Sequence, residues 1–182
     1  ALAAAAINND TATVADIVCE LAHTHAGRQE YWDACLARLR ELLATRPRSF
    51  TPEIVSRIAG AIAQMQSQDG FDGSKLSADI GVVNHSFVMM FRAKLFELLP
   101  LFLEEDLGRL AVGFTSPFLS EPELQRLLYR AAQLELGFLP TCAEHLASIK
   151  LVEEAARKQH PNIMDTMPAL ARGYCERLRD TA

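Results

Sequence analysis

The helical character of the chain is clearest in one short segment, Pro52-Glu53-Ile54-Val55-Ser56-Arg57-Ile58. Thr51 before it is a natural N-cap, proline suits the first helical position, and apolar residues then recur at helical spacing. A loosely similar segment, Pro122-Glu123-Leu124-Gln125-Arg126-Leu127-Leu128, begins about 70 residues later. That distance equals two helix–turn–helix units of about 35 residues, so the spacing predicts stacked helical hairpins.

Helical periodicity dominates residues 13–180, and no stretch of the sequence shows the alternation of a strand. The expected helices carry their apolar residues at 14–21, 32–43, 54–65, 87–98, 107–114, 124–134, about 141–159 and 164–178. We therefore expect an all-α chain of about eight helices, arranged as antiparallel hairpins stacked into a short α-solenoid.

Local signals mark where several of these helices begin and end. Ser120 and Glu123 have the spacing of a capping box, and Thr141 with Glu144 repeats it. Gly27, the Arg46-Pro47 pair, Pro100 and Gly137 are expected helix ends. Residues 69–81 form the longest irregular stretch. No linker divides the chain, so we expect one domain over 1–182, with 1–12 as an N-terminal extension.

The composition fits a globular chain, with 49% hydrophobic and 23% charged residues and a net charge of -5. The negative charge counts against broad nucleic-acid binding, which needs a basic face. The longest apolar run, residues 98–103, is interrupted by Pro100 and is far shorter than the roughly 20 residues of a membrane helix. We therefore expect no direct membrane insertion.

The sequence begins with an apolar, alanine-rich stretch at residues 1–6 and has Ala1 in place of methionine. Such a start is expected after removal of an import peptide, and the alternative is an arbitrary boundary of the sequence. We favour processing.

Metal and cofactor motifs are weak. Cys19 with His23 and Cys142 with His145 have helical spacing for a tetrahedral zinc. We instead interpret the four cysteines, which include Cys35 and Cys175, as buried free thiols in a reducing compartment. The loop that starts at Asp69 lacks the glutamate of a calcium loop, because Ile80 stands at its twelfth position. No phosphate loop is present, so we predict no metal and no cofactor.

No arrangement of residues indicates catalysis. His23 and His25 are two positions apart on an expected helix and face different directions, so we interpret them as an exposed helix end. Cysteine, serine and histidine occur without the motif that would single out a nucleophile. We therefore predict no catalytic residue and no enzymatic activity.

Four arginines are the candidate partner-binding residues. Arg57 and Arg126 occupy nearly matching places in the two similar segments, and Arg92 and Arg109 lie between them in the sequence. If the hairpins stack in register, the four side chains line one face and form a stripe for phosphates or an acidic partner. The alternative, which we favour, is a solvated face with local ion pairs.

Three stretches of the sequence carry a resemblance to a known family: residues 50–63, residues 103–114 and residues 119–136. They resemble degenerate organellar helical repeats of the pentatricopeptide and FAST-kinase-like classes, over roughly residues 13–140. The unit around Phe87 departs from the pattern, and no base-reading position can be transferred.

The resemblance implies a mitochondrial matrix protein. Some members of these classes bind single-stranded RNA, one base per repeat, and others serve as structural subunits, such as a pentatricopeptide-like subunit on the F1 α subunits of euglenozoan ATP synthase. The leading hypothesis is a non-catalytic helical-repeat accessory subunit of a mitochondrial complex, most specifically ATP synthase F1. The alternative is an organellar RNA-binding protein in transcript processing or translation.

Overall fold

Every regular element is helical in the part of the chain that the computed structural model describes, residues 10–24, 29–66, 82–113, 120–136 and 143–180. This confirms the predicted all-α class. The contacts divide the chain into two compact units, residues 1–98 and 99–182. The sequence predicted no boundary at this point, because Pro100 was interpreted only as the end of a helix.

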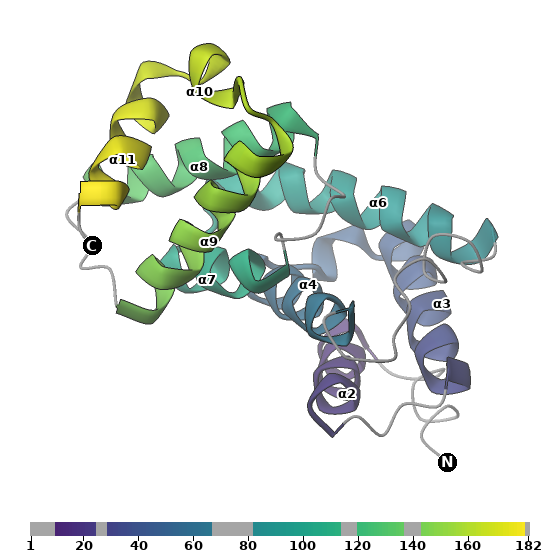
Figure 1. Ribbon diagram of the computed structural model, residues 1–182. Helices are drawn as coiled ribbons and strands as arrows, with labels where there is room; N and C mark the ends of the chain where they lie inside the picture. Colours follow the sequence, from purple (N-terminus) through teal and green to yellow (C-terminus); the bar gives the residue numbers. More distant parts are fainter. Residues whose placement is uncertain (1–9, 25–28, 67–81, 114–119, 137–142, 181–182) are drawn as a thin grey trace. The chain divides into compact units, whose positions relative to one another are not determined.

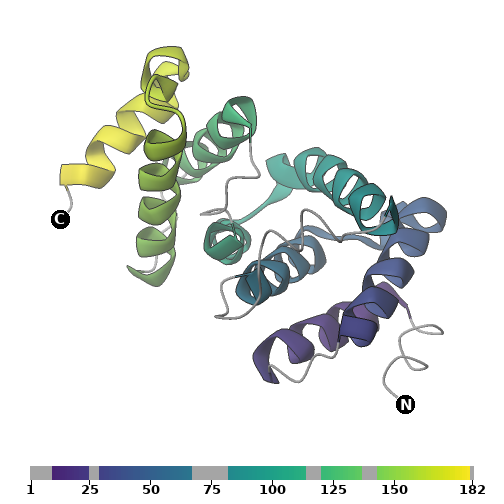
Figure 2. The same ribbon diagram turned by 45° about the vertical axis from the view of Figure 1, so that its right-hand side comes forward.

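The first unit contains four described α-helices and one 3-10 turn (Figure 1). They are α2 (Thr11–Thr24), α3 (Gln29–Thr45), η1 (Pro47–Ser49), α4 (Pro52–Gln66) and α6 (Val82–Leu98). The most extensive packing joins α2 to α4 and α3 to α6, and α2 also contacts α3. The views in Figures 1 and 2 both show α2 lying beside α4.

Side-chain caps fix the starts of two helices in the first unit. Asp10 precedes α2, and its carboxylate accepts the backbone N–H of Thr13 at 2.9 Å. Thr51 precedes α4, and its hydroxyl accepts the N–H of Ile54 at 3.3 Å, as its predicted N-cap role requires. The end of α3 at Thr45 follows from Pro47, because the residue before a proline avoids the helical conformation.

The second unit contains five described α-helices and one 3-10 turn. They are η2 (Leu99–Leu101), α7 (Glu104–Gly113), α8 (Glu121–Leu136), α9 (Ala143–Gln159), α10 (Ile163–Thr166) and α11 (Ala169–Asp180). Here α7 packs most extensively on α9, and α8 on α11. Apolar side chains that are fully or almost fully buried fill this unit, among them Phe102, Leu107, Leu124 and Ile163.

Carboxylates close the first turns of α7 and α8. Asp106 accepts the N–H of Leu103 at 3.1 Å, and Glu123 accepts the N–H of Ser120 at 2.9 Å. The second bond is the glutamate half of the predicted capping box. The Ser120 hydroxyl donates to the same Glu123 carboxylate at 2.7 Å instead of accepting a backbone N–H.

The predicted eighth helix, with apolar residues at 164–178, is two helices in the structure. Met167 separates α10 from α11 and is extended, with φ -71° and ψ 140°. The reason is Pro168, which disfavours the helical conformation of the residue before it. The predicted loop at 69–81 and the predicted signals at Gly27, Gly137 and Thr141 lie outside the described residues.

Each unit therefore packs its first main helix on its third and its second on its fourth. Two stacked helical hairpins are expected to pack in this way. The two similar segments begin α4 and α8, which occupy different places in their units, so their likeness reflects shared helix-start signals. Continuation of the stacking along the whole chain stays a prediction.

Candidate interaction surface

The four arginines predicted to bind a partner divide equally between the units. Arg57 lies on α4 and Arg92 on α6 in the first unit, whereas Arg109 lies on α7 and Arg126 on α8 in the second. A single face shared by all four arginines remains a prediction.

Arg57 is part of the packing between α4 and α2. Its Nη2 lies 2.5 Å from Oδ1 of Asp16, and this hydrogen bond is the main reason that the pKa of Arg57 is raised. The thiol of Cys19 donates to the backbone carbonyl of Arg57 at 3.7 Å. Arg57 therefore already has a carboxylate partner within its own unit, as predicted for a solvated helix face with local ion pairs.

Arg109 has two carboxylates close to it on its own helix. Its guanidinium lies 3.5 Å from Glu105 and 3.6 Å from Asp106. Asp106 is buried and also holds the N–H of Leu103. The local charge around Arg109 is therefore already neutralised, which weakens the case for a phosphate stripe through this residue.

Arg126 lies on the solvent-facing side of α8. The exposed residues of that helix recur at helical spacing and are Pro122, Arg126, Tyr129 and Gln133. Arg126 is the only charged residue among these four positions. Arg126 is exposed, whereas the other three predicted arginines are half-buried.

Two leucines next to α8 are unusually exposed. Leu101 and Leu103 keep 62% and 58% of their surface accessible, although Phe102 between them is fully buried. Their exposure was not predicted from the sequence, because residues 98–103 were treated as one apolar run. The signal that was available is Pro100, which ends the helix and allows successive side chains to point in different directions.

Arg130 fixes this leucine segment against α8. Its Nε and Nη2 donate to the backbone carbonyl of Phe102 at 3.1 and 2.9 Å, and its Nη1 lies 3.5 Å from the amide oxygen of Gln133. The turn η2 also packs directly on α8.

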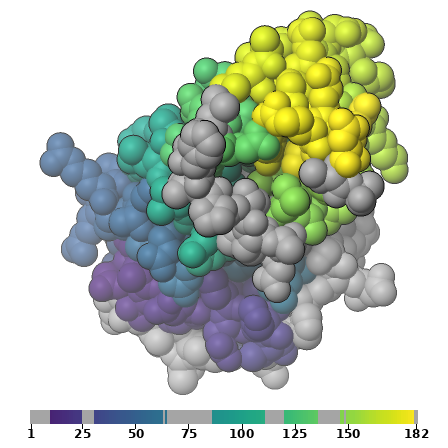
Figure 3. Space-filling view, turned by 90° about the vertical axis from the view of Figure 1, so that its left-hand side faces the viewer, coloured from purple at the N-terminus to yellow at the C-terminus, as the bar shows by residue number. Residues whose placement is uncertain are grey.

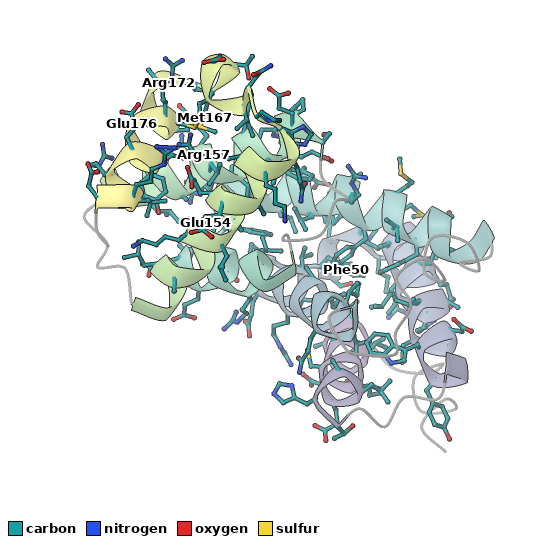
Figure 4. The ribbon with its side chains drawn as sticks, viewed as in Figure 1. Phe50, Glu154, Arg157, Met167, Arg172 and Glu176 are labelled. Carbon is teal, nitrogen blue, oxygen red and sulfur yellow. The ribbon has the colours of Figure 1, made fainter. Side chains whose placement is uncertain are left out.

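A second cluster of charges lies inside the second unit, between α9 and α11. Glu153 is only 4% exposed, accepts a hydrogen bond from Nε of Arg157, and has Nε of Arg179 at 3.8 Å. Arg177 of α11 pairs in addition with Glu135 of α8. Figure 4 shows Arg157 directed from α9 toward α11.

This cluster joins helices and is poorly suited to hold a ligand. The Nη2 of Arg157 is buried and has no acceptor among the described residues. No solvent reaches this atom, so a bound anion has no access to it without rearrangement. The exposed side of α11, yellow in Figure 3, carries Arg172, Glu176 and Arg179, which mix both signs of charge.

Metal ligands do not converge in the described ranges, where no group of three or more His, Cys, Asp or Glu side chains is placed to hold a metal ion. Cys19 is half-buried and His23 is exposed at the end of α2. Cys142 and the side chain of His145 lie outside the description. Among the described residues, no helix is long and apolar enough to cross a membrane.

Three buried groups make the stability of the chain sensitive to alkali. Burial raises the pKa of the Cys35 thiol from 9.0 to about 11 and that of Cys175 to about 12, and it also raises the pKa of Tyr174. Below pH 9.0 both thiols keep their protons in the folded and unfolded chain, so this contribution is intact. Above it, the unfolded chain loses its protons first and folding weakens.

We expect the free energy of unfolding to fall by about 1.4 kcal/mol per pH unit for each such group. Urea titrations at about pH 8 and about pH 11 measure the change, and the Cys35 contribution amounts to about 2 kcal/mol over that range. The variant Cys35→Ala should show a shallower decline than the wild type, whereas His23→Ala, at an exposed site, should not. A stability that is constant to about pH 11 would contradict this account.

We found no protein-family model that matches the chain, and no match among curated proteins or solved structures. The interpretation of its surfaces therefore depends on their own chemistry.

Proposed function

We propose that the chain is a non-catalytic helical subunit that docks onto a protein partner. The exposed pair Leu101 and Leu103 carries this proposal. Exposed apolar side chains that are grouped on a surface are typical of protein interaction sites. The proposed host, taken from the resemblance to organellar repeat proteins, is a mitochondrial complex, and the most specific candidate is the F1 sector of ATP synthase.

Charge separates this proposal from RNA binding. The chain has a net charge of -5, and carboxylates already pair with candidate arginines, Asp16 with Arg57 and both Glu105 and Asp106 with Arg109. A polyanion needs uncompensated cations to release its counterions. These ion pairs therefore favour a protein partner over a phosphate backbone.

The test is purification of the tagged full chain from its native mitochondria under mild conditions, followed by identification of the proteins that migrate with it. We expect it to remain with the F1 α subunit after the membrane sector is dissociated. Single-stranded RNA should bind only as a salt-sensitive background. Recovery with ribosomal particles, or a sequence-selective RNA complex at physiological salt, would replace this proposal with the RNA-binding alternative.

A further inference from the structure

We draw no further inference here: the strongest candidate, the apolar patch that the exposed Leu101 and Leu103 form between η2 and α7, carries none because nothing in the structure shows what covers it.

Discussion

Replacing Phe50 with alanine is expected to lower the free energy of unfolding by about 3 to 5 kcal/mol, because the change removes a buried ring and leaves a cavity. Phe50, labelled in Figure 4, is 2% exposed and lies between η1 and α4. Its backbone N–H donates to the Pro47 carbonyl. Val55, one turn into α4, is also fully buried, and the two residues have the spacing of a hydrophobic staple around the Thr51 cap.

Urea unfolding followed by circular dichroism measures this effect. The control is Phe50→Leu, which keeps most of the apolar volume and should cost less than about 1.5 kcal/mol. Amide hydrogen exchange should show the loss of protection in α2 and α4 of the alanine variant. A cost below about 1 kcal/mol for Phe50→Ala would mean that the ring is not part of the core.

Replacing Glu153 with alanine is expected to destabilise the second unit by about 3 kcal/mol. The change leaves Arg157 and Arg179 without the carboxylate that both approach, and Arg157 is partly buried. Removal of one partner from a buried ion pair costs more than the pair itself contributes, because the remaining charge is poorly solvated.

The matched control replaces both members of the pair, as Glu153→Met/Arg157→Met. This double variant should lie within about 1 kcal/mol of the wild type, since apolar side chains of similar length fill the same space without a desolvated charge. Chemical denaturation of the wild type and of both variants supplies the comparison. A double variant as unstable as Glu153→Ala would show that packing, and not the unpaired charge, dominates.

The sequence was sufficient to predict helices whose signals are local. Thr51 as the cap of α4, Glu123 as the box residue of α8 and the end of α3 before Pro47 each depend on side chains within one turn of the helix end. The break at Pro168 follows from an equally local rule, but the regular apolar spacing on both sides of it concealed the break.

Features that depend on long-range packing were not predicted. The exposure of Leu101 and Leu103 depends on the contact between η2 and α8, which hydropathy does not encode. Glu153 is one of two adjacent glutamates in α9, and only the placement of α11 shows that it is the buried one. The grouping into two units likewise follows from contacts between helices and not from composition.

The packing of the first helix on the third affects how this chain emerges from a ribosome. Arg57 follows its partner Asp16 in the sequence by roughly 40 residues, and at a translation rate of about 5 to 20 residues per second this segment takes several seconds to appear. During that time the face of α2 that packs on α4 has no native partner. Until α4 has been synthesised, this face is therefore exposed to non-native apolar contacts.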